Sequence, residues 1–328
     1  MIRFGVIGTN WITDRFLDAA LQLDDFSLRA VYSRTEVRAK EFAEKYDVNA
    51  TYTDLDAFSA SDAIDAVYIA SPTAFHKEHA ITCMNGGKHV IVEKPFASNE
   101  KEVQEMIAVA KANNVTLMEA MKTTHTPNFQ VVKDSLDKIG PVRRYIANFC
   151  QYSSRYDTYK EGTVLNAFKP ELSNGSLMDI GVYCLYPMVA LFGAPQSIQA
   201  SAIRLDSGVD GQGNVLAQYD GMNGIAIFSK ITDSNLPSEI QGEQGSIIIR
   251  KFSDMEGIQI VYRDGTTEDI GLEQNKNAMI YETKSFLETI ENKELENPIN
   301  TWERSIQTMQ ILDEARKQIG VIFPADSN

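Results

Sequence analysis

The chain has 328 residues, of which 43% are hydrophobic and 23% are charged, a composition typical of a globular protein rather than a disordered chain. Its 45 acidic and 31 basic residues give a net charge of −14, which disfavours binding to nucleic acid or to an anionic membrane surface. We expect no membrane helix, because no apolar run approaches the roughly 20 residues needed, and the N-terminus lacks a signal-peptide pattern. The length suggests about two domains. Three cysteines without a CxxC pair favour a cytoplasmic protein with no disulfide framework.

Short apolar runs alternate with amphipathic stretches over the first 121 residues. Strands are expected at Ile2–Ile7, Ser27–Tyr32, Ala66–Ala70, Lys88–Glu93 and Val115–Glu119. Helices are expected between them, among them Trp11–Leu23, Glu36–Tyr46 and Glu100–Asn113. Alternating strands and helices are typical of a parallel sheet with right-handed crossovers, so residues 1–121 are predicted to form a doubly wound α/β Rossmann domain.

The pattern changes after Met121. Further strands are expected at Val142–Tyr152, Ser197–Leu205, Val215–Tyr219, Gly224–Ile231, Ser246–Phe252 and Ile258–Tyr262. Turn-rich segments such as DGQGN and DGMNG separate most of them and favour antiparallel pairing, whereas Ser153–Ser173 is expected to be a loop. With helices expected at Lys276–Glu291 and Trp302–Ile319, residues 122–328 are predicted to form an α+β domain with an open, mostly antiparallel sheet.

The first strand runs into a turn with part of a dinucleotide-binding fingerprint. Such a site needs a tight turn, close approach of backbone N–H groups to a pyrophosphate and a helix N-terminus. Gly8 supplies the first glycine of G-x-G-x-x-G, while Asn10 and Thr13 replace the other two. Asn tolerates a left-handed backbone better than most residues, which keeps the turn feasible. A plain turn is the alternative, but its place between the first strand and the first helix favours NAD(P).

The end of the second strand bears on the choice between NAD and NADP. NAD sites place an acidic residue there to bind the ribose 2′-hydroxyl, and this chain has Ser33 and Arg34 instead. Arg38 and Lys40 extend a small basic cluster in an acidic protein, which favours the 2′-phosphate of NADP(H) while leaving NAD(H) possible. The alternative is a solvated helix start whose charges pair with one another.

Glu93, Lys94 and Pro95 follow a buried strand. Ligands of open parallel sheets bind outside the carboxyl ends of the strands, so Lys94 is expected where a nicotinamide ring and its substrate meet. Pro95 directly after the strand is compatible with a cis peptide. The alternative for Lys94 is an ordinary surface lysine.

A third group of residues lies in the segment GSLMDIGVY, residues 175–183. If Ser176 caps a helix, Asp179 and Tyr183 lie four residues apart on one face. A tyrosine has a pKa near 10 and needs a nearby cation to act as an acid or base at neutral pH, and Lys94 is the candidate. The alternative is an amphipathic helix with its tyrosine packed in the core.

Two further patterns are weaker indications of a functional site. Tyr156 and Lys160 have the Tyr-x-x-x-Lys spacing of short-chain dehydrogenases, but they lie in a polar segment. His76 and His79 do not have the spacing of a zinc motif, so no metal is expected. His76 is expected either to contact the cofactor or to cap a helix.

Taken in order, these residues resemble the Gfo/Idh/MocA oxidoreductases, whose Glu-Lys-Pro signature matches residues 93–95. The chain looks most similar to the dimeric dihydrodiol/D-xylose dehydrogenase branch. The supporting segments are LMEA at 117–120, DIGVYC at 179–184, SGVD at 207–210, GEQG at 242–245 and RKQIGVIFP at 316–324. The mammalian members of this branch are more aromatic after LMEA, where this chain reads MKTT at residues 121–124. Of a sugar, a polyol and a dihydrodiol-like substrate, a sugar or small polyol is therefore favoured over a polycyclic dihydrodiol.

The resemblance implies NADP(H)-dependent hydride transfer at a secondary alcohol or carbonyl, with Tyr183 as acid/base, Lys94 as its partner and Asp179 as the aspartate of the same helix. It also implies a homodimer, or a higher homo-oligomer, through the C-terminal sheet. The cofactor contacts are expected from Gly8, Thr9, Asn10, Trp11, Ile12, Ser33, Arg34, Arg38, Ser71, Thr73, His76, Glu93, Lys94 and Pro95. Two other classes stay open: a non-catalytic NAD(P)-binding sensor and a methyl-donor-binding Rossmann protein. The second class is expected to have an acidic residue after the second strand, which this chain lacks.

Overall fold

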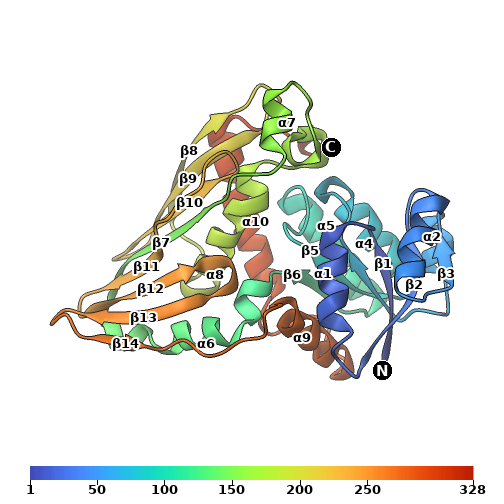
Figure 1. Ribbon diagram of the computed structural model, residues 1–328, viewed down its shortest axis with the longest axis horizontal. Helices are drawn as coiled ribbons and strands as arrows, with labels where there is room; N and C mark the ends of the chain where they lie inside the picture. Colours follow the sequence, from blue (N-terminus) through green and yellow to red (C-terminus); the bar gives the residue numbers. More distant parts are fainter. Residues whose placement is uncertain (328) are drawn as a thin grey trace. The chain divides into compact units, whose positions relative to one another are not determined.

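The computed structural model, which describes residues 1–327, divides the chain into two units (Figure 1). The first unit contains Met1–Lys122 and Asn275–Ser305, and the second contains Thr123–Gln274 and the residues from Ile306 onward. The predicted division at residue 121 grouped 275–305 with the second domain, whereas in the structure these residues pack with the first unit.

The first unit is built on a parallel sheet of six strands with the order β3-β2-β1-β4-β5-β6. Its strands are β1 (Ile2–Ile7), β2 (Phe26–Tyr32), β3 (Ala50–Tyr52), β4 (Ala66–Ile69), β5 (His89–Glu93) and β6 (Leu117–Ala120). This order confirms the predicted doubly wound Rossmann fold. The strand order reverses between β1 and β4, and ligands of such sheets bind at the carboxyl ends of strands near that point.

Helices cover both faces of this sheet (Figure 1). They are α1 (Trp11–Ala20), α2 (Glu36–Lys45), α3 (Leu55–Ser59), α4 (His76–Asn85), α5 (Glu100–Asn113) and α9 (Met279–Glu291). Phe16 of α1 stacks on Tyr68 of β4 at 3.7 Å between ring centroids, and Phe286 of α9 meets Phe4 of β1 edge-on at 6.1 Å. Gly5 points to the opposite face, where Phe58 of α3 leaves no room for a Cβ. α9 therefore belongs to the first unit because its aromatic side chain completes the core beside α1.

The second unit is built on an open sheet of eight strands with the order β14-β13-β12-β11-β7-β10-β9-β8. Its strands are β7 (Val142–Cys150), β8 (Ser197–Arg204), β9 (Asp210–Gln218), β10 (Asn223–Ser229), β11 (Ser238–Gly242), β12 (Gly245–Lys251), β13 (Glu256–Tyr262) and β14 (Thr267–Asp269). Only β7 and β10 pair in parallel among the described strands of this sheet, which confirms the predicted mostly antiparallel sheet.

The two faces of this second sheet differ in burial. Tyr145 is buried, pairs with Gly224 and Ile240, and donates a hydrogen bond to the carbonyl oxygen of Cys184 in α8 (Val182–Phe192) at 2.7 Å. The next residue, Ile146, pairs with Ile225 and is only half-buried. The sheet therefore has one face packed on its helix and one partly exposed face that carries apolar residues. The remaining helices are α6 (Pro127–Asp134), α7 (Tyr156–Lys160) and α10 (Trp302–Ile319), and α7 lies within the segment expected to be a loop.

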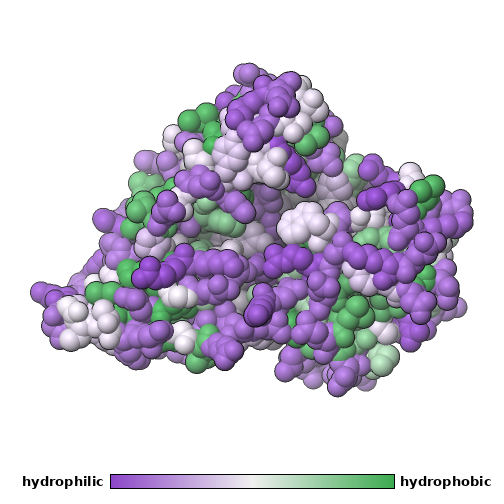
Figure 2. Space-filling model, viewed as in Figure 1, coloured by the Kyte–Doolittle hydropathy of each residue, from purple (hydrophilic) through white to green (hydrophobic). Residues whose placement is uncertain are grey.

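Among the described residues, one helical segment, Pro170–Phe192, is long and apolar enough by composition to cross a membrane. The expectation that no such run exists is therefore wrong. However, 78% of its most apolar window is buried inside the structure, as expected of a core segment. The face of the molecule drawn in Figure 2 is mostly hydrophilic, with small separate apolar areas.

Candidate active site

The turn after β1 requires a glycine. Gly8 has a φ of +103°, in the region that side chains disfavour, and a Cβ at Gly8 would lie 2.6 Å from the carbonyl oxygen of Ala70. The bare backbone therefore lies directly before the N-terminus of α1. A glycine turn leading into a helix N-terminus can bind a pyrophosphate, so this turn fits the dinucleotide that the sequence predicts.

Asn10 and Thr13 stabilise this turn in place of the missing glycines. The Asn10 side chain accepts a hydrogen bond from the backbone N–H of Ile12 and donates one to the carbonyl oxygen of Ala70, at 2.9 and 2.8 Å. Thr13 Oγ1 donates to the carbonyl oxygen of Gly8 at 2.8 Å. Asn10 has a φ of −117°, so the argument that Asn tolerates a left-handed backbone does not apply; the residue is an ordinary helix N-cap.

The basic residues after β2 divide into two groups. Lys40 pairs with Glu36 at 2.6 Å, as the alternative of internally paired charges expects. Arg38 lies 3.6 Å from Glu41 and also donates to the carbonyl oxygen of Thr9 at 3.2 Å, so it reaches the glycine turn. Arg34 is exposed at the end of the strand. Three other residues predicted to contact the cofactor lie at the glycine turn and the start of α1. Thr9 and Ile12 are half-buried, and Trp11 is 58% exposed.

His76 joins two backbone segments at the carboxyl ends of β4 and β5. Its Nε2 lies 2.8 Å from the carbonyl oxygen of Ser71 and its Nδ1 lies 3.0 Å from that of Pro95. Burial lowers the pKa of His76 to about 4, so the ring is neutral at physiological pH. The geometry gives this histidine a positioning role between the two segments rather than a free ring nitrogen. Thr73, also predicted at the cofactor, is buried in the turn that precedes α4.

Lys94 lies directly after β5, between a buried carboxylate and a cis peptide. Glu93 is buried and accepts a hydrogen bond from the Tyr68 hydroxyl at 2.6 Å, and the peptide bond from Lys94 to Pro95 is cis. Burial raises the pKa of Glu93, and the charge of Lys94 opposes this effect, so the two groups are close. Lys94 itself is half-buried. The structure thus places Lys94 at the edge of the sheet where the sequence predicts it.

Two further buried glutamates lie close to Glu93, and sequence reasoning missed both. Glu119 on β6 accepts hydrogen bonds from Ser305 Oγ at 2.6 Å and from the backbone N–H of Phe96 at 3.0 Å. Burial raises its pKa to about 7. Glu282 on α9 is fully buried, and within residues 1–327 neither of its carboxylate oxygens has a hydrogen-bond partner. Desolvation and the charge of Glu93 hold the pKa of Glu282 well above its usual range.

In the second unit, the segment that carries Asp179 and Tyr183 is not a regular helix. Leu177–Gly181 form a π-helical turn, which continues into α8. Such turns are common at functional sites. Tyr183 is half-buried, and its ring meets Phe149 of β7 edge-on at 5.5 Å.

The prediction that Ser176 caps this segment is wrong. Ser176 has helical φ and ψ, and its hydroxyl is buried without a partner among the described residues. The cap comes from Asp210 at the start of β9, which accepts a hydrogen bond from the backbone N–H of Leu177 at 2.6 Å. Gly175 is required beside it, because a Cβ there would lie 2.4 Å from Asp210 Oδ1.

Asp179 forms an ion pair that the sequence analysis did not foresee. Lys230 follows β10, and its Nζ lies 2.7 Å from Asp179 Oδ2. The Lys230 side chain is 3% exposed, whereas that of Asp179 is 38% exposed. Because β7 and β10 are parallel, their carboxyl ends bring Phe149 and Lys230 to the same edge of the sheet, close to Tyr183 and Asp179.

The weaker sequence patterns do not form sites in the structure. Lys160 pairs with Asp157 at 2.7 Å and lies over the rings of Tyr152 and Tyr156, in a surface cluster. No group of three or more His, Cys, Asp or Glu side chains within residues 1–327 is arranged to hold a metal ion.

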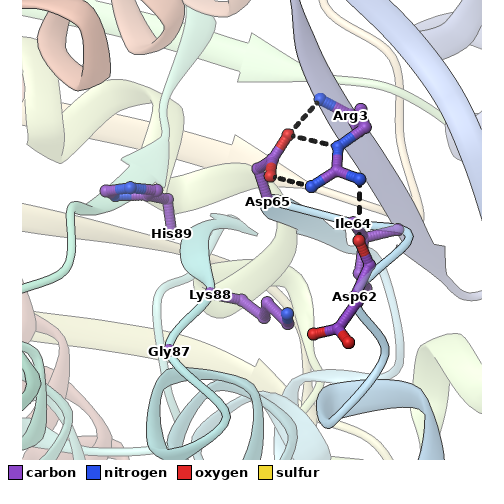
Figure 3. A pocket seen from close by; sticks show the side chains of 7 residues that line it. All are labelled: Arg3, Asp62, Ile64, Asp65, Gly87, Lys88 and His89. Atoms are coloured by element: carbon purple, nitrogen blue, oxygen red, sulfur yellow. Dashed lines mark hydrogen bonds and ion pairs between the residues drawn. The ribbon is translucent and has the colours of Figure 1, made fainter.

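A polar pocket in the first unit lies at the other edge of its sheet (Figure 3). Arg3 and Asp65 form a bidentate pair there at 2.6 and 2.9 Å, and Lys88 donates to the carbonyl oxygen of Ser61. Arg3 and His89 lie near the amino ends of β1 and β5. Because ligands of parallel sheets bind at the carboxyl ends, this pocket is not the candidate site.

Comparisons with known proteins match both units. Residues 2–121 match the family described as "Oxidoreductase family, NAD-binding Rossmann fold", and residues 129–248 match the "GFO/IDH/MocA C-terminal domain". The chain is 57% identical over 326 residues to scyllo-inositol 2-dehydrogenase (NADP(+)) IolU of Bacillus subtilis, covering 99% of each chain. It is 29% identical to trans-1,2-dihydrobenzene-1,2-diol dehydrogenase of Xenopus tropicalis, covering 98% of this chain and 99% of that one.

Among solved structures, the chain resembles KijD10, a 3-ketoreductase from Actinomadura kijaniata, in complex with NADP and TDP-benzene. The TM-score is 0.86 at 25% identity, and the match covers 97% of this chain and 98% of that one.

Proposed function

Because the chain belongs to the Gfo/Idh/MocA family of oxidoreductases, we propose that it transfers a hydride between NADP(H) and a ring carbon of a cyclic polyol. The chain is an NAD(P)-dependent oxidoreductase acting on CH–OH groups, and its relation to the dihydrodiol branch is confirmed. The observation that carries the finer proposal is the 57% identity, over 99% of both chains, to a scyllo-inositol 2-dehydrogenase. Residues 121–124 of this chain, MKTT, include no aromatic residue, which also favours a small polar ring over a polycyclic substrate.

The cofactor is NADP(H) in preference to NAD(H). The two residues directly after β2 are Ser33 and Arg34, where NAD sites place an acidic residue. Arg38 extends the cluster toward the glycine turn through the carbonyl oxygen of Thr9. Two guanidinium groups and a hydroxyl suit a 2′-phosphate, because charge-assisted hydrogen bonds to phosphate are strong and the Arg fork matches its oxygens.

In the proposed reaction, the dinucleotide held by the Gly8 turn and by Ser33, Arg34 and Arg38 would supply hydride acceptor and donor chemistry at the carbinol or carbonyl carbon of the substrate. Tyr183 takes the hydroxyl proton in the oxidation and gives it back in the reduction. Lys94 lowers the pKa of this tyrosine and orients the substrate oxygen, and Asp179 hydrogen-bonds the substrate or positions the pair. The partial exposure of Tyr183 and Asp179 supports these roles, because a core tyrosine would be fully buried.

The partly exposed face of the second sheet supports a homodimer. Half-buried Ile146 and Ile225 lie on this face beside exposed Leu216, in one row across β7, β10 and β9, and half-buried Ile248 lies on the same face beyond Glu239. Neighbouring apolar side chains on an exposed sheet face are typical of a protein–protein interface. We propose that a second copy of the chain covers it. A cytoplasmic location remains a prediction.

The test is a substrate panel run with purified protein and both cofactors. Scyllo-inositol, myo-inositol, aldoses and a dihydrodiol are each offered with NADP+ and NAD+, and the appearance of reduced cofactor is followed at 340 nm. We expect turnover of a cyclic polyol with NADP+, and a loss of 10²–10⁴-fold in kcat for Tyr183→Phe, typical of a lost acid/base. Full activity of that variant, or turnover of the dihydrodiol alone, contradicts the proposal.

A further inference from the structure

We propose that Lys230 is a positioning residue that fixes the carboxylate of Asp179 and the π-helical turn that leads into Tyr183 of α8; this role rests on the proposed function of those two residues. Lys230 directly follows β10, and its ammonium group lies 2.7 Å from Asp179 Oδ2. Since the lysine is buried and the aspartate is partly exposed, Lys230 contacts Asp179 from the interior of the unit. It is not oriented to meet a substrate itself.

The remaining donors of Lys230 point to the segment before the π-helical turn. Nζ lies 3.2 Å from the carbonyl oxygen of Ala167 and 3.3 Å from Asn174 Oδ1. It also lies 5.4 Å from the centroid of the Phe168 ring. An ammonium group has three N–H donors. Asp179, the carbonyl oxygen of Ala167 and Asn174 provide one acceptor for each of them. Lys230 therefore joins the segment 167–174 to Asp179 through one buried atom.

Asp210 completes the arrangement from the start of the same turn. Its carboxylate accepts from the backbone N–H of Leu177, and burial raises its pKa to about 6 while the charge of Lys230 opposes this rise. Two different contacts therefore hold the turn: the ion pair of Lys230 with Asp179 within it, and the hydrogen bond of Asp210 with Leu177 at its beginning. A buried lysine is costly unless it is paired, and here the pairing with Asp179 fixes one point of the turn. The register of that turn determines where Asp179 and Tyr183 point.

The test compares Lys230→Met with Lys138→Met. Lys138 is a matched control, because it also forms a 2.7 Å ion pair, with Glu268, but its side chain is 45% exposed. We expect Lys230→Met to lower kcat on the polyol by 10-fold or more. The KM for NADP+ and the Kd for NADPH are expected to stay within 3-fold of wild type. The control is expected to change none of these values. Lys230→Gln, which keeps N–H donors without the charge, is measured beside it in case the Met variant does not fold.

A double-mutant cycle with Asp179→Asn separates positioning from a general structural effect. If Lys230 acts through Asp179, the kcat of the double variant is expected to lie within 3-fold of the kcat of Asp179→Asn alone. Multiplication of the two losses overturns the proposal.

Amide hydrogen exchange of residues 167–183 gives a readout that needs no substrate. We expect faster exchange in Lys230→Met than in wild type or Lys138→Met. If wild type turns over no polyol but exchange still rises, the proposed function fails and the positioning of the turn stands. If wild type is active and neither kcat nor exchange changes in Lys230→Met, the Lys230 proposal fails.

Discussion

The carbonyl oxygen of Ala70 lies so close to Gly8 that a Cβ on the glycine would be 2.6 Å from it. Gly8→Ala must therefore displace either the end of β4 or the turn itself, both of which face the predicted pyrophosphate site. We expect this variant to lose at least 10-fold in affinity for NADPH and to unfold at a lower temperature. Titration of intrinsic fluorescence with NADPH, and a thermal melt, measure the two effects.

Gly87→Ala is the matched control for this variant. Gly87 also has a positive φ, +74°, but nothing lies within 4 Å of a Cβ there. We expect a cost of roughly 1 kcal/mol in stability from the backbone conformation alone, and unchanged NADPH affinity. An equal loss of affinity in both variants would show that close approach at Gly8 does not matter for binding.

Arg34→Ala tests the preference for NADP. A charge-assisted hydrogen bond contributes about 1.5–3 kcal/mol, so we expect the Kd of NADPH to rise roughly 10-fold or more while that of NADH changes less than 2-fold. Arg29→Ala removes an exposed arginine of β2 that donates a hydrogen bond to Ser27 Oγ, and serves as the control. Isothermal titration gives the Kd of NADPH and of NADH for wild type and for both variants. Equal loss for NADPH and NADH in Arg34→Ala contradicts recognition of the 2′-phosphate.

Local patterns predicted the elements of both units well where they were long and periodic. Glu100–Asn113 and Trp302–Ile319 are helices with the predicted bounds. Strand Ala50–Tyr52 was missed because three residues carry too little alternation, and Ser238–Gly242 because polar Glu239 and Gln241 mask its pattern. The helix at Met279–Glu291 was predicted, but an apolar stripe does not say which sheet covers it.

The site was predictable only where chemistry follows a local pattern. The sequence placed Lys94 after a buried strand, and the same signal was available for Lys230, which directly follows β10. The cap of the π-helical turn was not readable, because Asp210 lies 33 residues from Leu177 in the chain. Local capping rules favoured Ser176, but tertiary packing supplies a carboxylate instead.

Glu119→Gln is expected to change how stability depends on pH. Because burial raises the pKa of Glu119 from 4.5 to about 7, the folded protein holds this proton more tightly than the unfolded chain. Its contribution to stability is full below pH 4.5 and is lost as pH rises through about 7. The shift corresponds to about 3 kcal/mol, so the glutamine variant is expected to be more stable than wild type at pH 8 by up to that amount.

Urea unfolding at pH 5 and pH 8 checks this expectation. The advantage of Glu119→Gln is expected to be small at pH 5 and largest at pH 8, and Glu44→Gln, on the exposed face of α2, is expected to show no difference. The glutamine can keep the two contacts of Glu119, accepting from the backbone of Phe96 and donating to Ser305 Oγ. A variant less stable than wild type at pH 8 would mean that the carboxylate is stabilising.

Ile225→Asp tests the proposed homodimer. Ile225 lies in the middle of the sheet, paired with Ile146 on one side and Leu216 on the other, all on the partly exposed face. A carboxylate there would be desolvated in a dimer without a partner, whereas in a monomer it can reach water. We expect wild type to sediment at twice the 36.6 kDa of one chain, and Ile225→Asp at the monomer mass with its fold intact by circular dichroism. Leu272→Asp, in a segment outside the sheet with a 55% exposed side chain, is expected to remain dimeric. A monomeric wild type, or a dimeric Ile225→Asp, would place any interface elsewhere on the chain.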